Sequence, residues 1–549
     1  MTYDEARAQL VAWRDDYPSD PFSSDAMLRR LLARYLEGPR LADLERRASA
    51  FGVAMTTVVG PAAARYEQRA HLPEFAPYDG IGRRVERVDF DPAYHVAGEA
   101  VWASGVVAFS GEPGRAFEQA TLLYLLSLEG EAGHACPATC TIGLARALRR
   151  RAEPRVADRF LPALLEADYA SAERGAQFLT EVQGGSDVGA NACLAEPSGD
   201  GETYRITGEK WFCSVADADQ FFVTARVPRG AAGTAGLASF VVPRELDGRP
   251  NGFTLRRLKD KLGTRGLASG EIDFLGAVAW PIGPLEEGFK TAVGVVLNTS
   301  RWMTAIGAAG IMRRAVLEAR NFARHREAFG QRIERYAMVR TRLADMAVAA
   351  DGALALVMAL TDLEDRIDAG TASEGDVHWH RLLVNLVKYL TSRQATSVAR
   401  DGIEILGGNG TIEEFSVLPR LYRDAIVYES WEGTHNVLAA QVLNDLTRLP
   451  LVEVASERLR ALVRGGVAGL DDGLTIALEG LARCREDAAF AAWHLRDVLD
   501  RLGYVAEAIY LADAGKPVAA YHLLARNSPG YDAVADAGLA ERVDKLLST

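Results

Sequence analysis

The most informative part of the chain is residues 428–436, which read Tyr428-Glu429-Ser430-Trp431-Glu432-Gly433-Thr434-His435-Asn436. Gly433 marks a turn, and Thr434 is a residue that commonly begins a helix. Glu432 has a simple structural interpretation here, because an acid near a helix N-terminus stabilises the helix dipole by roughly 0.3 to 1 kcal/mol. It also has a chemical one, since a carboxylate held on a turn can act as a general base. The surrounding motifs decide between the two.

Two further turns precede this stretch. Residues 404–410 read Glu-Ile-Leu-Gly-Gly-Asn-Gly, and residues 326–330 read Arg-Glu-Ala-Phe-Gly. A glycine pair leaves bare backbone that can lie against a flat or phosphate-bearing ligand. Each turn also has a plain alternative, because glycines stop helices and an exposed arginine is usually only solvated. Residues 419–424, Pro-Arg-Leu-Tyr-Arg-Asp, follow the glycine turn and favour the functional interpretation.

Two more motifs lie in the first half of the chain. Residues 180–188 read Thr-Glu-Val-Gln-Gly-Gly-Ser-Asp-Val, and residues 208–214 read Gly-Glu-Lys-Trp-Phe-Cys-Ser. Taken alone, the first is an ordinary surface turn of small residues. A flat aromatic ligand, however, needs hydrogen bonds along its edge, and glycines let the backbone approach it where a Cβ would clash.

In order and spacing these motifs resemble the signatures of the acyl-CoA dehydrogenase superfamily, namely T-E-x-x-x-G-S-D, G-x-K, R-x-x-F-G, G-G-N-G and Y/W-E-G-T. Residues 183–187, 208–214, 258–263 and 431–433 resemble a narrower group, the AidB-like branch named for an adaptive alkylation-response flavoprotein. The resemblance extends over roughly residues 60 to 447. Beyond them the chain is rich in Ala and Leu and has a helical texture.

The resemblance implies an α+β fold that is mostly α. Apolar patterning agrees, with helical periodicity first, short β-rich runs from about residue 175 to 285, and long helical segments afterwards. We predict four parts: an N-terminal helical domain over 1–172, a middle β-barrel-like domain over 173–286, a C-terminal helical bundle over 287–448, and an extra helical extension over 449–549.

The same resemblance implies a function. It predicts an oxidoreductase that contains FAD and converts an acyl thioester, such as an acyl-CoA, to its trans-2-enoyl form. The α-hydrogen of a thioester is only weakly acidic, so its removal requires a carboxylate held close to it, and the motif assigns that task to Glu432. Partial burial beside Trp431 would raise the pKa of the Glu432 carboxyl and make it a better base.

The resemblance also implies a set of site residues. The residues expected to contact FAD are Thr180, Ser186, Phe212, Ser214, Arg326, Phe329, Gly407, Gly408, Thr434 and Asn436. The residues expected near the substrate are Trp431 and Arg301. Phe212 and Ser214 stand where relatives usually carry Trp and Thr, and Trp211 is an alternative for the aromatic position or a strand-core residue. No metal site is expected, because His134, Cys136 and Cys140 lack a second ligand pair.

Two alternative functions share this architecture. One is an AidB-like flavoprotein with a DNA-protective or other role outside dehydrogenation. Residues 450–549 hold 11 Lys/Arg against 15 Asp/Glu, so this region is net acidic by four charges and nucleic acid is an unlikely partner. The other is a flavin-dependent oxidase of a non-thioester substrate. Such enzymes use an Asp base or lack the Glu, so Glu432 favours dehydrogenation.

Composition sets the remaining expectations. The 549 residues carry a formal net charge of -12 and five scattered cysteines, which suit a reducing cytoplasm. The first residues lack a signal-peptide pattern, and the longest apolar runs are broken by Arg301 and Asp351, so no membrane association is expected. The resemblance further implies fatty acid metabolism, an acyl-CoA or acyl-carrier thioester as substrate, an external acceptor such as an electron-transfer flavoprotein, and a homo-oligomer, at least a dimer and in the family pattern a tetramer.

Overall fold

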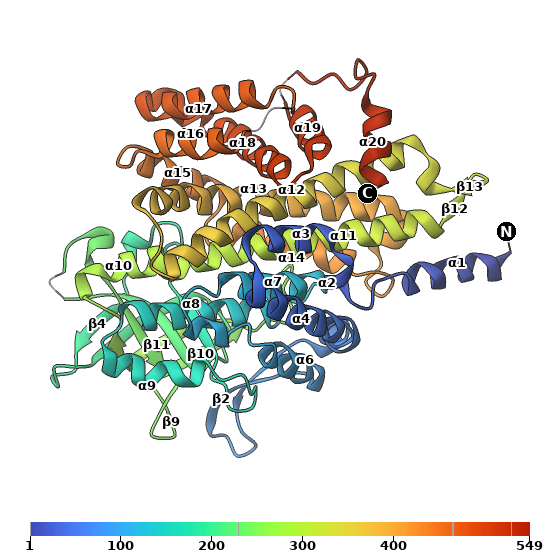
Figure 1. The fold of residues 1–549 in the computed structure, drawn as a ribbon. Coiled ribbons are helices and arrows are strands. Elements are labelled where there is room, and N and C mark those ends of the chain that lie inside the picture. The colour runs from blue at the N-terminus through green and yellow to red at the C-terminus, as the bar shows by residue number, and fades with distance from the viewer. Residues whose placement is uncertain (1, 229, 464–465, 529, 549) are drawn as a thin grey trace. The chain divides into compact units, whose positions relative to one another are not determined.

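The computed structural model describes residues 2–228, 230–463, 466–528 and 530–548, which form two compact units (Figure 1). The first unit comprises Met1–Val53, Ser127–Gly130 and Thr304–Thr549. The second comprises Ala54–Leu126 and Glu131–Met303. Each unit is therefore assembled from segments that lie far apart in the chain, and each is described by itself below.

A closed β-barrel forms the centre of the second unit. Its strands are β3 (Gly175–Phe178), β4 (Leu194–Pro197), β5 (Tyr204–Ser214), β6 (Gln220–Arg226), β7 (Leu237–Pro243), β10 (Phe253–Leu258) and β11 (Ser269–Pro281). The strand order is β10-β11-β5-β4-β6-β3, and β7 pairs with both β11 and β6, which closes the ring. Most of these pairs are antiparallel, while β3 and β4 run parallel to β6. β8 (Glu245–Leu246) and β9 (Arg249–Pro250) form a separate short hairpin.

Helices complete the second unit. They are α5 (Gly60–Tyr66), α6 (Pro92–Ala103), α7 (Ala116–Leu128), α8 (Ala135–Arg151), α9 (Pro154–Leu164) and α10 (Gly288–Thr291). A buried cluster of apolar side chains from α8, α9, β6 and β7 includes Leu148, Phe160, Phe222 and Val241. This cluster joins α8 and α9 to strands β6 and β7 of the barrel.

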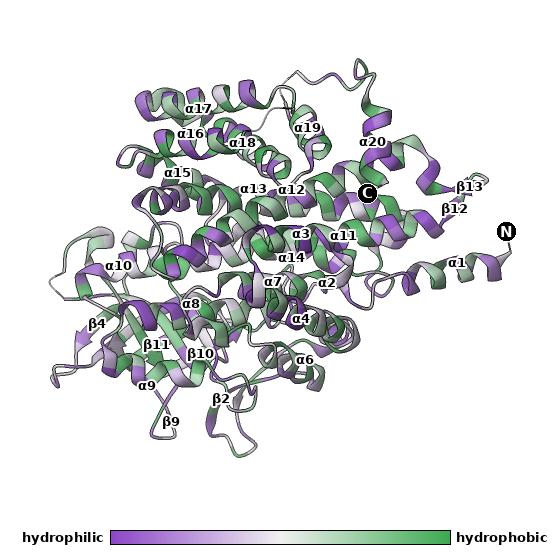
Figure 2. Ribbon diagram, viewed as in Figure 1, coloured by the Kyte–Doolittle hydropathy of each residue, from purple (hydrophilic) through white to green (hydrophobic). Residues whose placement is uncertain are grey.

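Long helices form the first unit. They are α11 (Asn298–His325), α12 (Ala337–Asp368), α13 (Glu374–Leu406), α14 (Leu418–Ser430) and α15 (His435–Leu446), and α11 begins in the second unit. β12 (Glu327–Ala328) and β13 (Gln331–Arg332) form a small hairpin between α11 and α12. By length and composition α12 is the one helix among the described residues that could cross a membrane, yet 78% of its most apolar window is buried. Figure 2 shows the apolar residues along α12, which are what a core helix requires.

The remaining helices of the first unit come from the two ends of the chain. The N-terminal ones are α1 (Tyr3–Asp15), α2 (Pro21–Ser24), α3 (Ala26–Tyr35) and α4 (Gly38–Ala54). The extension supplies α16 (Leu451–Leu462), α17 (Leu470–Glu486), α18 (Ala488–Asp513), α19 (Pro517–Arg526) and α20 (Leu539–Leu547). α18 packs against α12, α13 and α15, so the extension is part of the unit that holds the predicted base (Figure 1).

The fold follows the sequence patterns closely, with one exception. Asp25 caps α3 by accepting a hydrogen bond from the Leu28 amide at 2.9 Å, as expected for the apolar stripe that follows it. The sequence did not predict the hairpin of β1 (Glu74–Tyr78) and β2 (Arg84–Asp89), because β1 contains a proline, β2 is rich in charge, and both strands are largely exposed or only partly buried. The division into domains at residues 172, 286 and 448 stays a prediction, since the two units combine distant segments.

Candidate active site

The turn between α14 and α15 carries Glu432. Its backbone is left-handed, with φ +56° at Glu432 and +110° at Gly433. Glycine tolerates such angles, whereas a residue with a Cβ occupies them at a cost of roughly 1 to 3 kcal/mol. Glu432, which is partly buried, therefore adopts a backbone conformation that is usually found at glycine.

Lys388 of α13 anchors this turn through hydrogen bonds to its backbone. Its side chain is fully buried, and its ammonium donates hydrogen bonds to the carbonyl of Glu429 at 3.0 Å and to that of Gly433 at 2.8 Å. These two carbonyls stand on either side of Glu432, one near the end of α14 and one before α15. A charged donor strengthens both hydrogen bonds, so the turn is clamped at its two ends.

The side chain of Glu429 ties the same turn to both neighbouring helices. It accepts hydrogen bonds from Thr396 of α13 and from His435 of α15, with His435 Nε2 and Glu429 Oε2 2.9 Å apart. Burial opposes its ionisation, but these partners hold the pKa of the Glu429 carboxyl below its usual range. Glu429 is therefore an ionised structural acid three residues before Glu432.

Trp431 forms the apolar side of the turn. Its ring stacks on Tyr428 with centroids 5.2 Å apart and planes 24° apart. Tyr428 is buried and lies against Gly307 of α11, where a Cβ would come within 2.8 Å of the ring. The aromatic pair therefore rests on the helical core, and Trp431 is fixed beside Glu432 as the motif predicted.

Thr434 and Asn436 lie at the start of α15. Thr434 is the N-cap residue, its side chain makes no capping hydrogen bond, and it is exposed. Asn436 is also exposed, and its Oδ1 accepts a hydrogen bond from Arg496 of α18 at 3.3 Å. Because Thr434 does not cap the helix, the first amide groups of α15 are available to an anion.

The glycine turn 407–411 divides into an open and a packed part. A Cβ added at Gly407 or Gly408 would meet nothing within 4 Å, and both residues are exposed. A Cβ at Gly410 would come within 2.6 Å of the Ile403 carbonyl, so Gly410 serves the packing of the turn on α13. Gly407 and Gly408 are thus the bare surface that the sequence indicated.

The β12–β13 hairpin presents Phe329 to solvent. The side chain of Phe329 is 97% exposed, and its backbone is left-handed with φ +53°. Tyr336 supports the turn by donating a hydrogen bond to the Ala328 carbonyl at 2.8 Å, and Arg326, partly buried, precedes the hairpin. A large aromatic held outward in this way is typical of a contact surface.

In the second unit, Thr180 and Ser186 lie on the loop after β3. Ser186 is exposed and Thr180 is partly buried. A Cβ at Gly185 would come within 2.8 Å of Thr180 Oγ1, so glycine is needed there for the loop to fold back on Thr180. Gly184, with φ +152°, faces open space. Gly185 therefore allows the loop to fold, and Gly184 leaves the outer face of the loop open.

A buried ion pair holds this loop to β5. Lys210 Nζ and Glu181 Oε1 are 2.7 Å apart, and both side chains are almost fully buried. Burial opposes the charge of Glu181, but Lys210 and the surrounding donors hold the pKa of its carboxyl below its usual range. The Trp211 amide also donates to the Thr180 carbonyl at 2.9 Å. The acid of the first motif and the lysine of the second thus bind each other.

A β-bulge in β5 explains the two adjacent aromatics. Ile272 of β11 pairs with Lys210 and Gly270 pairs with Cys213, so β5 has one extra residue between these pairs. Lys210 and Cys213 both point inward, while Phe212 is 53% exposed and Trp211 is partly buried. A bulge re-aims side chains in this way. The side chains of Trp211 and Phe212 therefore both lie outside the barrel core.

Lysine side chains stabilise the end of the bulged strand. Lys259 lies with its ammonium 3.5 Å from the centre of the Trp211 ring and 5.0 Å from that of Phe212. Ser214 Oγ is 3.2 Å from Ser269 Oγ, which accepts a hydrogen bond from Lys261 at 2.9 Å. Trp211 is thus a cation-binding aromatic at the barrel edge, and Phe212 is the more exposed ring.

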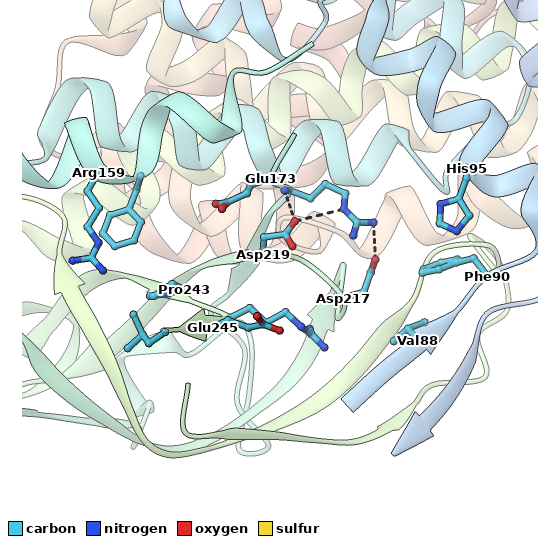
Figure 3. A pocket seen from close by; sticks show the side chains of 13 residues that line it. Val88, Phe90, His95, Arg159, Glu173, Asp217, Asp219, Pro243 and Glu245 are labelled. Atoms are coloured by element: carbon cyan, nitrogen blue, oxygen red, sulfur yellow. Dashed lines mark hydrogen bonds and ion pairs between the residues drawn. The ribbon is translucent and has the colours of Figure 1, made fainter. Parts of the chain in front are cut away.

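Arg301 and a separate cavity lie elsewhere in the second unit. Arg301 is 3% exposed in the first turn of α11, and its role near substrate stays a prediction. A cavity of about 530 Å³ is lined by Phe90, Arg174, Asp217, Asp219 and other residues, none of them a predicted site residue. Arg174 forms ion pairs with both aspartates, Asp217 and Asp219, which are labelled in Figure 3. Burial opposes the charge of Arg174, but these acids raise its pKa, so the charges of this cavity compensate one another.

Comparison with known proteins decides the family. Matching family profiles are the Acyl-CoA dehydrogenase, C-terminal domain over residues 286–447, the Acyl-CoA dehydrogenase, middle domain over 176–276, and the Adaptive response protein AidB N-terminal domain over 15–171. AidB of Escherichia coli (strain K12) is 34% identical over 388 residues, which are 68% of this chain and 69% of that protein. The chain belongs to the acyl-CoA dehydrogenase family.

Two further matches support this membership. Acyl-CoA dehydrogenase family member 11 of Caenorhabditis elegans is 31% identical over 438 residues, which are 77% of this chain and 70% of that protein. The solved structure of Caenorhabditis elegans ACDH-11 in complex with C11-CoA has a TM-score of 0.81 at 26% identity, covering 96% of this chain and 90% of that one. The predicted AidB-like resemblance and fold class are confirmed, and the chain is an oxidoreductase of the acyl-CoA dehydrogenase family.

The motifs of this acyl-CoA dehydrogenase family member fall into two sets. Thr180, Ser186, Phe212 and Ser214 belong to the barrel unit, and the structure brings them onto one loop and one strand joined by Glu181 and Lys210. Trp431, Glu432, Thr434 and Asn436 form one turn of the helical unit, which also holds Arg326, Phe329, Gly407 and Gly408. The roles of these residues toward FAD and substrate stay predictions.

Sequence reasoning missed the residues that hold the motifs of the acyl-CoA dehydrogenase family in place. Lys388 is one, although a single lysine inside the apolar run 382–390 is a signal for a buried functional charge. Thr396 gave no signal of its own. Lys259, Glu181 and Lys210 were part of the quoted motifs, yet the pairing of Glu181 with Lys210 requires the fold to bring the loop after β3 against β5.

Proposed function

We propose that this chain is an FAD-dependent dehydrogenase of acyl-CoA thioesters, in which Glu432 removes the α-proton. The observation that carries the proposal is the clamped turn, because it holds a carboxylate in a left-handed conformation at φ +56° between two carbonyls bound by Lys388. Strain of this kind persists only where surrounding contacts determine it, and such residues cluster at active sites.

The residues present fit FAD. Thr180 and Ser186 offer hydroxyls on an open loop, and Phe212 offers a half-exposed ring. The uncapped start of α15 offers amide groups to a diphosphate, and the bare turn at Gly407 leaves room for an adenosine. When bound, FAD would supply the acceptor for the β-hydride of the substrate.

The chain's own residues perform the proton transfer. Glu432 takes the α-proton of the thioester, and the electron pair of the broken Cα–H bond forms the Cα=Cβ double bond as the β-carbon loses its hydride. Lys388 fixes the carbonyls on both sides of Glu432, so the carboxylate does not need to reorganise during the reaction. Trp431, stacked on Tyr428, forms an apolar wall beside the carboxylate and keeps water from that side.

We propose acyl-CoA as the substrate class. ACDH-11, with 26% identity to this chain, has been solved with C11-CoA, which supports a thioester of coenzyme A over other substrates. The acyl chain length and an acyl-carrier protein as donor remain outcomes of the experiment below. A role in fatty acid metabolism follows from the substrate.

We propose an external electron acceptor, such as an electron-transfer flavoprotein, and a homo-oligomer of at least two copies, with a tetramer as the family pattern. The outward ring of Phe329, 97% exposed, supports a second copy, because it has the character of an interface residue and stands beside Arg326. We also propose a cytoplasmic location, which the five scattered cysteines support, and no nucleic-acid partner, which the net charge of -12 and the acidic extension support.

The experiment is an anaerobic titration of the purified protein. The FAD spectrum is recorded first, and acyl-CoA thioesters of graded length are then added while the absorbance of oxidised flavin is followed. The proposal expects loss of that absorbance with a preferred chain length. Bound FAD that no acyl-CoA reduces would redirect the assignment to acyl-carrier substrates, to oxidation of a non-thioester, or to a non-catalytic AidB-like role, and duplex DNA binding would favour the last.

A further inference from the structure

The extension reaches the predicted catalytic turn through α18. Gly503 lets α18 approach α13 closely, since a Cβ there would come within 2.8 Å of Leu390. Arg496, Asp500 and Glu507 lie on one face of α18, because their spacings of four and seven residues bring side chains to the same side of a helix. Glu507 is fully buried and accepts a hydrogen bond from Gln394 of α13 at 2.8 Å.

Asp500 binds two residues of α13. Its Oδ1 accepts a hydrogen bond from the Tyr389 hydroxyl at 2.6 Å and pairs with Arg393. Arg393 also donates to the Tyr389 hydroxyl at 2.8 Å. Tyr389 is 1% exposed, and its burial together with the bond to Asp500 raises its pKa to about 12, so its hydroxyl remains a donor.

Tyr389 connects Asp500 to the turn that carries Glu432. Its ring meets the imidazole of His435 edge-on, with centroids 5.4 Å apart and planes 89° apart. His435 follows the turn directly, and its Nε2 pairs with Glu429, which precedes Glu432 by three residues. A continuous set of contacts therefore runs from Asp500 through Tyr389 and His435 to both ends of the turn.

A second contact reaches the same helix start. Arg496, one turn of α18 before Asp500, donates a hydrogen bond to Asn436 Oδ1 at 3.3 Å. α18 thus touches α15 directly through Arg496 and indirectly through Tyr389. Arg496 also lies over the Tyr389 ring, with its guanidinium carbon 6.0 Å from the ring centre, so two linked contacts on consecutive turns of one helix constrain where α15 begins.

We infer that Asp500 and Tyr389 are positioning residues for Glu432, and that the extension is a structural part of the active site. This inference rests on the proposed function of Glu432. The extension orients the base through Tyr389 and His435 and does not contact the reacting atoms. It gives Asp500 of α18 a positioning role that needs no further partner.

The partial exposure of Asp500 and Arg393 distinguishes a positioning role from a general contribution to the free energy of unfolding. The side chains of Asp500 and Arg393 are 30% and 32% exposed, so solvent screens part of their attraction, and an asparagine at position 500 keeps the size of the side chain and an oxygen that accepts hydrogen bonds. A rate of proton removal is far more sensitive, because a shift of about 1 Å in a positioned group can reduce it by about a hundredfold. Loss of Asp500 is therefore expected to change the rate of reaction and leave the fold intact.

The test compares Asp500→Asn with Asp497→Asn in the FAD-loaded enzyme. Asp497 lies on the same helix, and its side chain is 82% exposed near His494, which makes it a matched control. Anaerobic stopped-flow measures the limiting rate of flavin reduction and the apparent Kd of the best acyl-CoA. The limiting rate of Asp500→Asn is expected to fall about tenfold, with FAD content, apparent Kd and Tm close to wild type. Asp497→Asn is expected to match wild type in all four.

A second variant tests the route. Tyr389→Phe keeps the ring on His435 and removes the hydroxyl, so the double variant with Asp500→Asn is expected to be no slower than the slower single variant. Wild-type rates in Asp500→Asn, additive losses in the double variant, or a loss of rate that only follows lost FAD would each overturn the inference. A wild-type enzyme that no thioester reduces would instead contradict the proposed function on which the inference rests.

Discussion

The turn at Glu432 and the loop at Gly184 meet the same demand in opposite ways. Both need a left-handed backbone, with φ +56° at Glu432 and +152° at Gly184. The loop uses glycine, which adopts this conformation without strain, and the turn uses a glutamate, which does not. A side chain is thus retained at a strained backbone position where its chemistry is needed. Neighbouring residues must then hold the backbone of that position in place.

The two segments are also held by different forces. Lys388 donates to neutral carbonyls on both sides of Glu432, so a cation clamps the backbone of the turn directly. In the loop, Lys210 pairs with the carboxylate of Glu181, and the backbone follows that side chain. The clamp acts on geometry, whereas the buried pair acts chiefly on stability. The following predictions test this distinction.

Within this comparison, the largest effect is expected from Lys388→Met. The variant leaves the carbonyls of Glu429 and Gly433 without their charged donor and frees Glu432 from its fixed position. We expect kcat to fall about a hundredfold and the free energy of unfolding to fall by about 3 kcal/mol. Anaerobic flavin reduction and urea unfolding measure the two. Lys545→Met changes a lysine that is 60% exposed and serves as the control. Normal turnover in Lys388→Met would show that Lys388 does not position Glu432.

Breaking the buried pair of the loop comes next. Glu181→Gln leaves the Lys210 ammonium buried without its carboxylate, which costs about 3 to 5 kcal/mol in the free energy of unfolding. Adding Lys210→Met is expected to recover part of that loss, because no buried charge then remains. Urea unfolding checks both, with Glu209→Gln, whose side chain is 49% exposed, as control. A double variant less stable than Glu181→Gln alone would contradict a pairing role.

A smaller effect is expected from Gly185→Ala. The new Cβ would come within 2.8 Å of Thr180 Oγ1, and relieving such a clash costs about 1 to 3 kcal/mol. We expect a purified protein with reduced FAD content, as measured by the ratio of flavin to protein absorbance. Gly80→Ala adds a Cβ that meets nothing within 4 Å and is expected to retain full FAD. Equal FAD in both variants would show that the loop tolerates the clash.

The smallest effect is on pH dependence. Because the folded-state pKa of Glu181 lies below the usual value of 4.5, its stabilising contribution is present above pH 4.5 and is lost as pH falls through the lowered pKa. The Tm of wild type minus that of Glu181→Gln should therefore be constant from pH 5 to 7 and shrink below about pH 4.5. A difference that grows on acidification would have the wrong sign for an ionised Glu181.

The sequence predicts much of the fold, because periodicity reports burial directly. The stripe of Met27, Leu28, Leu31 and Leu32 predicts α3, and the long apolar segments after residue 288 predict α11 to α13. The β1–β2 hairpin could not be predicted, since β1 contains Pro77 and β2 is mostly charged, so neither strand carries an alternating apolar pattern. Local patterns therefore identify elements that bury an apolar face and miss elements that do not.

The sequence predicts the site less completely. The motifs identify Glu432, Thr180 and Gly407 by order and spacing, but Lys388 and Asp500 are 44 and 68 residues from Glu432 and act only after folding. The choice between Trp211 and Phe212 depended on a bulge in the pairing of β5 with β11, which a single strand's sequence does not show. Residues that support the motifs through long-range contacts need the structure.

The most direct test of the central claim is the reduction of flavin by the best acyl-CoA in Glu432→Gln. Anaerobic stopped-flow compares this variant with wild type and with Glu414→Gln, which removes an exposed acid just after the glycine turn. The account predicts that Glu432→Gln keeps its FAD and slows flavin reduction by at least about a thousandfold, while Glu414→Gln behaves as wild type. Flavin reduction at the wild-type rate in Glu432→Gln would show that another group removes the proton.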